Sequence, residues 1–452
     1  MFRFPKVSRS AIALTGVAVV VAACTSDNTN VVLGPKQSDA NALFQNYVAL
    51  GNSITAGYQS SGIMDSTQRR SYAVLLAAQM GTRFAYPSLA GRGCAPPVVN
   101  FLTQARFGNT TAAPVTSSTC DLRSASSATD ILNNVAVPGA RAADLTATTG
   151  TSASNILTSL FLGGKTQVQK AVEALPTFAS VWIGGNDVLA AASTGFIVPV
   201  AGASPGITPQ ASYTASVDAA VTGLLAGNAN LKGILIGVPN VNNIPLFFPV
   251  AVLQTNAAFL AGFDQASGRV ATSTDPFKAA PLQIDPNCTG AGSTLISFPL
   301  AGQIAAFRND TNATGQPPKA ATSRRGHPPY IACGVSSTPG APPAPVGDAL
   351  ILTAAEQATI SSSTDAYNTY LSGKATALGW AYVNPNVLLD SLRTAGQVPV
   401  APNIGSSTAP FGAWFSLDGF HPSTQAHRAI MNHVAKAINT TYTTSLALIS
   451  VP

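Results

Sequence analysis

Residues 48–55 read Val48-Ala49-Leu50-Gly51-Asn52-Ser53-Ile54-Thr55, an apolar run that ends at a glycine and is followed at once by two polar residues. A short apolar run bounded by a turn residue is typical of a strand buried on both faces. Ser53 is therefore predicted to lie just beyond the end of a buried strand.

Outward from this stretch, predicted strands alternate with predicted helices. Apolar runs predict strands at residues 47–50, 135–137, 180–183, 234–238 and 381–383, and apolar stripes of helical period predict helices at 72–80, 168–175, 213–224, 354–377 and 426–438. Such alternation favours an α/β fold in which helices cover both faces of a parallel sheet, a three-layer αβα sandwich. Two long loop insertions interrupt the order, at residues 191–209 and 241–345.

Polar residues of chemical interest follow several of these predicted strands. Gly139 and Asn186 each come just after a strand, and Asp418 and His421 lie three residues apart before the last helix. The segments read Val137-Pro138-Gly139-Ala140, Gly184-Gly185-Asn186-Asp187 and Asp418-Gly419-Phe420-His421. Because open parallel sheets gather ligands at the carboxyl ends of their strands, we expect these residues to meet Ser53 at one edge.

Together, the four segments resemble the blocks of the SGNH (GDSL-type) hydrolases, over residues 44–438. The resemblance implies a flavodoxin-like sandwich and a serine esterase with Ser53 as nucleophile, His421 as base and Asp418 as its partner. It also implies an oxyanion hole formed by Ser53, Gly139 and Asn186. The first block departs from the family, because Asn52 stands where its members carry Asp.

The chemistry explains why these residue types are needed. A serine hydroxyl is a weak nucleophile until a base takes its proton, and histidine titrates near neutrality. A carboxylate holds the imidazole tautomer, and N–H donors stabilise the oxyanion of the tetrahedral intermediate. No metal or cofactor is expected, and His427 and His433, the latter on the polar side of the last helix, are interpreted as structural.

The N-terminus has the order of a signal peptide. Basic residues precede an apolar stretch that is too short to span a bilayer comfortably, and the stretch ends in Val21-Ala22-Ala23-Cys24. This end resembles the lipobox of bacterial lipoproteins, which implies cleavage after residue 23 and a lipid on Cys24. Thr25 in place of Asp favours the outer membrane of the bacterial cell envelope. Residues 24–43 are predicted to be a flexible tether, and residues 44–445 the hydrolase domain.

Four cysteines follow the predicted lipidation site. An even number in an oxidising compartment suggests two disulfides, with three possible connectivities. Proximity in the sequence favours Cys94–Cys120 and Cys288–Cys333.

Composition limits the possible partners. Charged residues make up 9% of the 452 residues, and the formal net charge of +6 falls to +3 once the three basic residues of the signal segment are left out. No basic cluster remains that could neutralise a run of phosphates, so nucleic-acid binding is not expected.

The substrate class stays open at this stage. Apolar residues after the 234–238 strand could line an acyl groove, which favours lipid or acyl esters, or could pack an inserted helix onto the core. They are Leu246, Phe247, Phe248, Val250, Leu253, Phe259 and Phe263. The alternatives are a carbohydrate O-acetyl esterase and a non-catalytic surface lipoprotein that binds a ligand.

Overall fold

The computed structural model describes most of the chain beyond the signal segment. The described residues are 30–32, 42–108, 131–147, 156–194, 197, 206–284, 294–309, 330–331 and 351–452. The predicted lipidation site Cys24 lies outside them, as do Cys120, Cys288 and Cys333.

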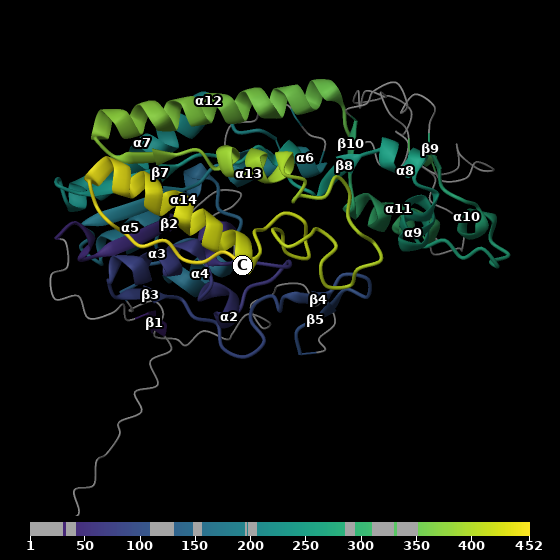
Figure 1. Ribbon diagram of the computed structural model, residues 1–452, viewed down its shortest axis with the longest axis horizontal. Coiled ribbons are helices and arrows are strands. Elements are labelled where there is room, and N and C mark those ends of the chain that lie inside the picture. The colour runs from purple at the N-terminus through teal and green to yellow at the C-terminus, as the bar shows by residue number, and fades with distance from the viewer. Residues whose placement is uncertain are drawn as a thin grey trace, which may run out of the picture.

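A central parallel sheet organises the fold (Figure 1). Within the described residues its strands follow the order β13, β7, β6, β2, and all neighbouring pairs are parallel. The strands are β2 (Tyr47–Gly51), β6 (Phe178–Trp182), β7 (Lys232–Ile236) and β13 (Ala381–Val383). Each of them overlaps a strand predicted from the sequence.

The remaining predicted strand, at 135–137, pairs with β2 only through an isolated bridge. Ala49 donates its N–H to the carbonyl of Asn133 at 2.8 Å, and Val135 and Val137 donate to the carbonyls of Ala49 and Gly51 at 3.0 and 3.2 Å. The segment therefore runs beside β2 and delivers residue 139 to the same edge of the sheet as residue 53.

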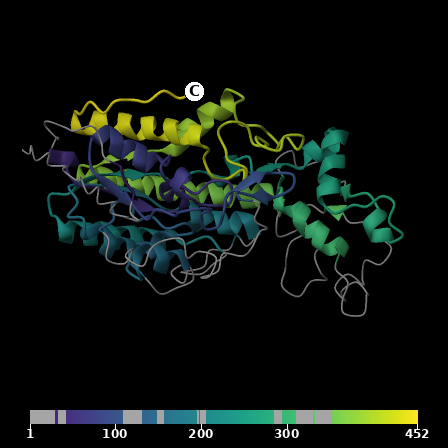
Figure 2. The same ribbon diagram turned by 90° about the horizontal axis from the view of Figure 1, so that it is seen from below.

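Alternating side chains of each strand face two helical layers. Val48 and Leu50 pack in one cluster with helices α5, α7 and α12, whereas Tyr47 and Ala49 pack in the other with α3 and α14. These helices are α3 (Tyr72–Met80), α5 (Gln167–Val172), α7 (Gln210–Gly227), α12 (Ala354–Leu378) and α14 (Thr424–Tyr442). Figure 2 shows α14, in yellow, along one side of the molecule. The three-layer αβα sandwich predicted from the sequence is confirmed.

Shorter elements complete this layered body. They are β1 (Asn30–Val32), which pairs with β3 (Phe84–Tyr86), the hairpin β4 (Val98–Asn100) and β5 (Ala105–Arg106), and the helices η1 (Ala42–Phe44), α1 (Ser53–Ala56), α2 (Asp65–Gln68), η3 (Ala142–Leu145), α4 (Ile156–Leu162), α6 (Gly185–Thr194), η4 (Val241–Asn243) and α13 (Pro385–Thr394). Two sequence predictions need correction here. The predicted tether contains β1, and the loop predicted from residue 191 begins only after α6 has ended at Thr194.

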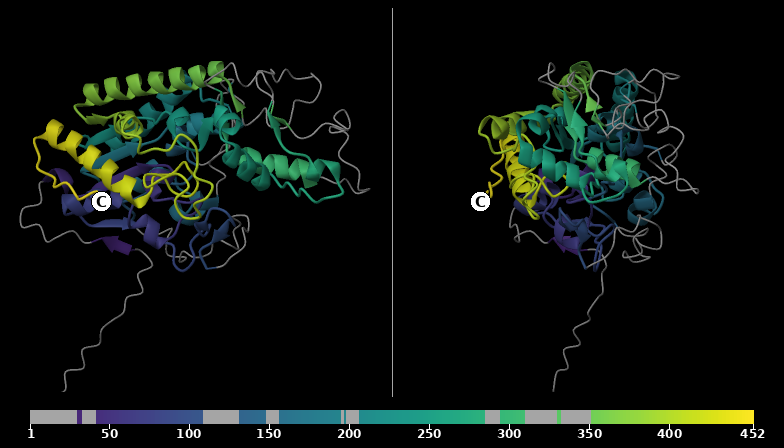
Figure 3. Two further views of the ribbon diagram at one scale, coloured as in Figure 1. Left: turned by 45° about the vertical axis from the view of Figure 1, so that its right-hand side comes forward. Right: turned by 90° about the vertical axis from the view of Figure 1, so that its right-hand side faces the viewer.

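The second predicted insertion forms a lobe of its own, which projects from one end of the layered body (Figures 1 and 3). This insertion lobe runs from β8 to β12. Its elements are β8 (Phe247–Pro249), α8 (Ala251–Thr255), α9 (Ala257–Ala266), α10 (Pro276–Ala279), β9 (Gln283–Ile284), β10 (Leu295–Ser297), α11 (Pro299–Asn309), β11 (Tyr330–Ile331) and β12 (Ile351–Leu352). Strands β8, β10 and β12 form an antiparallel sheet.

The lobe has its own apolar core. Five of the seven residues considered for an acyl groove are buried in it, namely Phe248, Val250, Leu253, Phe259 and Phe263. Phe247 is buried in the main core, and Leu246 is the only member that is not fully buried. The groove interpretation of this stretch is therefore wrong, because packing takes up nearly all of its side chains.

Candidate active site

Ser53 begins the short helix α1 directly after β2. Asn52 caps this helix, because its side-chain oxygen accepts the N–H of Ile54 at 3.1 Å. Gly51 leaves no room for a side chain, since a Cβ there would lie 2.5 Å from the carbonyl oxygen of Trp182. An amide oxygen caps a helix as a carboxylate does, so the turn forms with Asn52 in place of the family's Asp.

Gln167 is a component of the turn that sequence reasoning missed. Its side-chain oxygen accepts the N–H of Gly51 at 2.8 Å, and its side-chain N–H donates to the carbonyl of Gly51 at 2.9 Å. Gln167 is buried, and the backbone of Gly51 satisfies both the oxygen and the nitrogen of its side-chain amide. The sequence held no signal for this contact, which joins positions 116 residues apart.

His421 joins Ser53 to Asp418. Its Nε2 lies 2.9 Å from Ser53 Oγ, and its Nδ1 lies 2.8 Å from Asp418 Oδ2. We call these three residues the triad. The structure thus brings together all three side chains that the sequence predicted for nucleophile, base and carboxylate, across 368 positions of the chain.

The carboxylate of Asp418 accepts several further hydrogen bonds. Oδ1 accepts the backbone N–H of His421 at 2.8 Å and of Phe420 at 3.0 Å, and Oδ2 accepts that of Ser61 at 2.7 Å. Burial acts to raise the pKa of Asp418, but the charge of His421 and the hydrogen bonds outweigh it and hold the pKa well below its ordinary value. Asp418 is therefore ionised at neutral pH and favours a proton on Nδ1 of His421.

Two aromatic rings lie against the imidazole of His421. The ring centroids of Tyr58 and Phe420 are 4.8 and 4.6 Å from that of His421. Burial, followed by the charge of Asp418, raises the pKa of Tyr58 to about 12, so its phenol is neutral at neutral pH. These contacts fix the orientation of the imidazole from two sides.

Gly139 and Asn186, the predicted oxyanion donors, are brought close to each other. Gly139 is exposed and has φ 84°, and the amide nitrogen of Asn186 donates to the carbonyl of the next residue, Ala140, at 2.8 Å. A carboxamide nitrogen carries two hydrogens. Within the described residues only one of them is accepted, so the second N–H of Asn186 is available to a ligand. The hydrogen bond between Val137 and Gly51 ties this pair to β2, the strand that ends two residues before Ser53.

Asp187 ties the two loops of this pair together. Its Oδ2 accepts the N–H of Ala142 at 3.0 Å, and its backbone carbonyl accepts the N–H of Thr208 at 3.0 Å. Burial is the main cause that raises the pKa of Asp187 to about 6, against hydrogen bonds and the nearby Arg141 that lower it. Sequence reasoning quoted this residue only as part of a motif and gave it no role.

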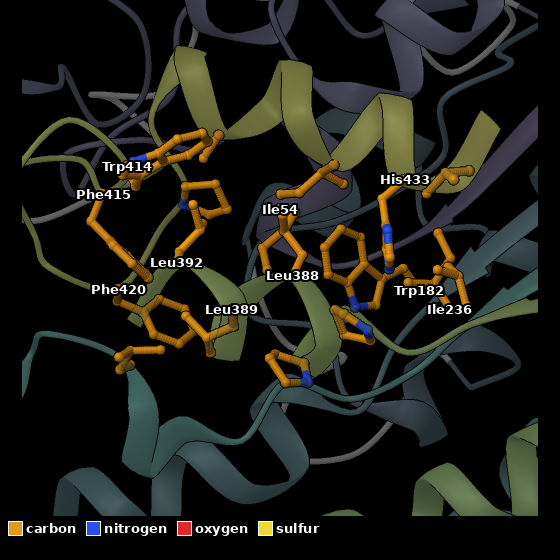
Figure 4. A pocket seen from close by; sticks show the side chains of 18 residues that line it. Ile54, Trp182, Ile236, Leu388, Leu389, Leu392, Trp414, Phe415, Phe420 and His433 are labelled. Carbon is orange, nitrogen blue, oxygen red and sulfur yellow. The ribbon is translucent and has the colours of Figure 1, made fainter. Parts of the chain in front are cut away.

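The two histidines on α14, His427 and His433, contact backbone groups and not the triad. Nδ1 of the buried His427 accepts the N–H of Tyr72 at 3.2 Å, and Nε2 of His433 lies 3.3 Å from the carbonyl of Asn384. His433 is half-buried and projects into an apolar pocket of about 80 Å³ (Figure 4). Its predicted position on the polar side of the helix is therefore wrong.

Three further features bear on the predicted disulfides, on metal binding and on membrane-spanning helices. Cys94 is buried and disulfide-bonded, while the other three cysteines of the two predicted pairs lie outside the described residues. In the described part of the chain, no group of three or more His, Cys, Asp and Glu residues is placed to hold a metal ion. None of the helices described there is long and apolar enough to cross a membrane.

The candidate site lies where β2 and β6 end, at one edge of the parallel sheet. This αβα sandwich has the SGNH hydrolase fold. Residues 47–258 match the family model GDSL-like Lipase/Acylhydrolase, so this part of the chain is similar to that family. The similarity points to hydrolysis of esters. The match includes Ser53, Gly139 and Asn186 but ends before Asp418 and His421, which only the three-dimensional structure joins to them. Neither a curated protein nor a solved structure matched the chain.

Proposed function

We propose that the protein is a serine hydrolase that cleaves carboxylic esters, preferably lipid or acyl esters, through an acyl-enzyme on Ser53. The observation that carries the proposal is the unbroken hydrogen-bonded line from Ser53 Oγ through His421 to Asp418, at 2.9 and 2.8 Å. These distances fall in the range that proton transfer between nucleophile and base requires.

In the first half of the reaction, Ser53 Oγ attacks the ester carbonyl carbon while its proton passes to Nε2 of His421. Asp418 keeps the other ring nitrogen protonated and stabilises the imidazolium that forms. The oxyanion accepts hydrogen bonds from the backbone N–H of Ser53 and Gly139 and from the free N–H of Asn186. Collapse of this intermediate breaks the ester C–O bond, and the alcohol leaves with the proton from His421.

In the second half, water attacks the acyl carbon and gives its proton to His421. The second tetrahedral intermediate collapses, the proton returns to Ser53 Oγ, and the carboxylic acid leaves. His421 is thus a base in each attack and an acid in each departure.

The proposed setting is the bacterial cell envelope, reached by export. The signal-like residues 1–23 and the lipobox-like Cys24 support a lipid anchor, with residues 24–43 as tether and residues 44–445 as the hydrolase domain. Thr25 after the cysteine supports the outer membrane. The disulfide at Cys94 supports an oxidising compartment, and we propose the pairs Cys94–Cys120 and Cys288–Cys333.

A series of p-nitrophenyl esters of increasing acyl length tests the activity and the substrate class together. We expect hydrolysis that favours octanoate over acetate, and a loss of at least about a thousand-fold in kcat for Ser53→Ala. The matched control is Ser391→Ala on α13, because Ser391 is exposed and its hydroxyl donates to the carbonyl of Leu388 and not to a residue of the triad. Preference for acetate would instead support the carbohydrate O-acetyl esterase, and absence of all hydrolysis would support the binding lipoprotein.

A further inference from the structure

Residues 59–62 form a tight turn beside the triad. Gln59 donates its N–H to the carbonyl of Gly62 at 2.8 Å, and Gly62 donates back to the carbonyl of Gln59 at 3.1 Å. Between them, Ser60 and Ser61 have φ 54° and 53°, the left-handed region that favours glycine and asparagine. Because a Cβ disfavours this conformation, contacts from outside the turn must hold two consecutive serines in it.

The N–H groups of the two serines bond to the loop that carries the triad carboxylate. Ser61 donates to Oδ2 of Asp418 at 2.7 Å, and the same oxygen lies 2.8 Å from Nδ1 of His421. Ser60 donates to the hydroxyl of Ser416 at 2.8 Å, and this hydroxyl donates to Oδ1 of Asp418 at 3.0 Å. The turn therefore positions both carboxylate oxygens, one directly and one through Ser416.

The carbonyl groups of the same two serines bond to the β4–β5 hairpin. Val98, the first residue of β4, donates its N–H to the carbonyl of Ser60 at 2.8 Å. Arg106, its cross-strand partner in β5, donates from Nη1 to the carbonyl of Ser61 at 2.8 Å and to that of Pro96 at 2.6 Å. The hairpin thus holds the turn on one side, and the turn holds the triad loop on the other.

Arg106 supplies a charged donor to this arrangement. Hydrogen bonds from a charged donor are shorter and about twice as strong as those between neutral groups. The charge of Arg106 also acts on Tyr58, whose ring lies against the imidazole of His421. Burial and the charge of Asp418 raise the pKa of Tyr58, and Arg106 acts in the opposite direction. The guanidinium therefore lies close enough to influence the surroundings of the triad, although it bonds to none of the three residues.

We propose that Arg106 is a positioning residue of the active site, which holds the carbonyl of Ser61 and thereby fixes the turn that orients Asp418 towards His421. The inference rests on the proposed ester hydrolysis at Ser53 and specifies what keeps its base in line. A carboxylate that rotates away no longer holds the tautomer of the imidazole or stabilises the imidazolium, so the chemical step slows. Ground-state binding of the ester does not depend on this alignment.

Steady-state kinetics on p-nitrophenyl butyrate test the proposal through the separate effects on kcat and KM. Arg106→Met removes the donor, and we expect kcat to fall at least about ten-fold while KM stays within about two-fold. Arg106→Lys keeps a charged donor on a shorter side chain without the guanidinium fork, so kcat should fall only about three-fold. A parent-like kcat in Arg106→Met would overturn the proposal. Should that variant not fold, a parent-like kcat in Arg106→Lys would do so.

The matched control is Arg92→Met, which removes an exposed arginine from the loop between β3 and β4. This control loses the same charge and gains the same side chain as Arg106→Met. We expect its kcat to equal that of the parent. An equal loss in both variants would show that net charge matters and not the contact with Ser61, and it would contradict the proposal.

Guanidinium ion separates positioning from a general loss of stability. In Arg106→Ala, millimolar guanidinium chloride can occupy the place of the missing side chain and should raise kcat at least about five-fold over the same concentration of sodium chloride. This concentration lies far below the molar range in which guanidinium unfolds proteins. A folded Arg106→Ala variant that shows no such rescue would contradict the role of Arg106.

Hydrogen exchange gives a readout that does not need catalysis. The amides of residues 59–62 should exchange at least about ten-fold faster in Arg106→Met than in the parent or in Arg92→Met, because the turn loses one of its supports. Unchanged protection would overturn the hold of Arg106 on the turn. A parent that hydrolyses no ester would show that the proposed function is wrong, and the exchange result would still decide whether Arg106 fixes Ser61.

Discussion

The central sheet and the insertion lobe bury their apolar side chains in different ways. In the sheet, each strand of three to five residues sends alternate side chains to two helical layers, and the strands are buried on both faces. In the lobe, strands of two or three residues and short helices close around one cluster that includes Phe248 and Phe263. The sheet edge holds the triad, whereas the lobe supplies none of its three residues. The proposed chemistry therefore belongs to the layered body and not to the lobe.

The largest expected effect separates two carboxylates, one in each region. Asp418→Asn should lower kcat by about a thousand-fold to ten-thousand-fold, because an amide cannot stabilise the imidazolium or hold the tautomer as a carboxylate does. Asp264→Asn in the lobe, where Asp264 pairs with Arg308 at 2.6 Å, should leave butyrate hydrolysis within about two-fold. Steady-state kinetics on p-nitrophenyl butyrate measure both, and equal losses would refute the separation.

Two buried phenylalanines compare the stability of the regions. Phe178→Ala in β6 should lower the free energy of unfolding of the whole chain by about 3–5 kcal/mol. Phe263→Ala in α9 should cost a similar amount but act on the lobe, whose cluster is separate. Hydrogen exchange is the measurement: we expect lost protection throughout the sheet for the first variant and within the lobe for the second. Loss of sheet protection in Phe263→Ala would show that the two regions unfold as one.

Asp187 should give the sheet edge a pH dependence. The pKa of Asp187 is about 6 in the folded chain, above its ordinary value of 3.8, so the folded state binds the proton more tightly than the unfolded state does. The contribution of Asp187 to the free energy of unfolding should therefore rise as pH falls from 7 towards 4, by about 2–3 kcal/mol at most. The charged and titratable groups that act on Asp187 are Arg141, Asp144, Tyr213 and Tyr367.

Urea unfolding of the parent and of Asp187→Asn at pH 4.5 and pH 7 isolates this contribution. Carboxylates with lowered pKa values, such as Asp418, contribute in the opposite direction, but they do so equally in both proteins. The free energy of unfolding of the parent relative to that of Asp187→Asn should rise as pH falls from 7 to 4.5. A constant difference would contradict the assignment.

The smallest effect concerns helix caps. Ser423 caps α14 two residues after His421, and Thr353 caps α12 directly after β12 of the lobe. Each substitution by Ala should lower the free energy of unfolding by about 1 kcal/mol. Only Ser423→Ala is expected to lower kcat measurably, because its helix start positions the loop that carries His421. Thermal unfolding and butyrate kinetics of both variants test this, and equal kcat values would show that the cap has no influence on the imidazole.

The sequence predicted much more of the sheet than of the lobe, for a physical reason. A parallel strand buried on both faces is a continuous apolar run, so Tyr47–Gly51 and Phe178–Trp182 were recognisable without any partner. The two- and three-residue strands of the lobe carry no such pattern. The apolar residues of this stretch were therefore interpreted as the possible lining of a groove. Likewise the triad was predictable because its residues follow strand ends or precede a helix. The contact of Gln167 with Gly51 was not, because nothing local marks it.

The account depends most on Ser53 being the nucleophile, and labelling with a fluorophosphonate probe tests this directly. Peptide mass spectrometry of the labelled protein should find one modified residue, Ser53, and the label should be absent from Ser53→Ala and strongly reduced in His421→Ala. A protein that hydrolyses esters but carries the label on another serine, or that is labelled equally after Ser53→Ala, would contradict the account.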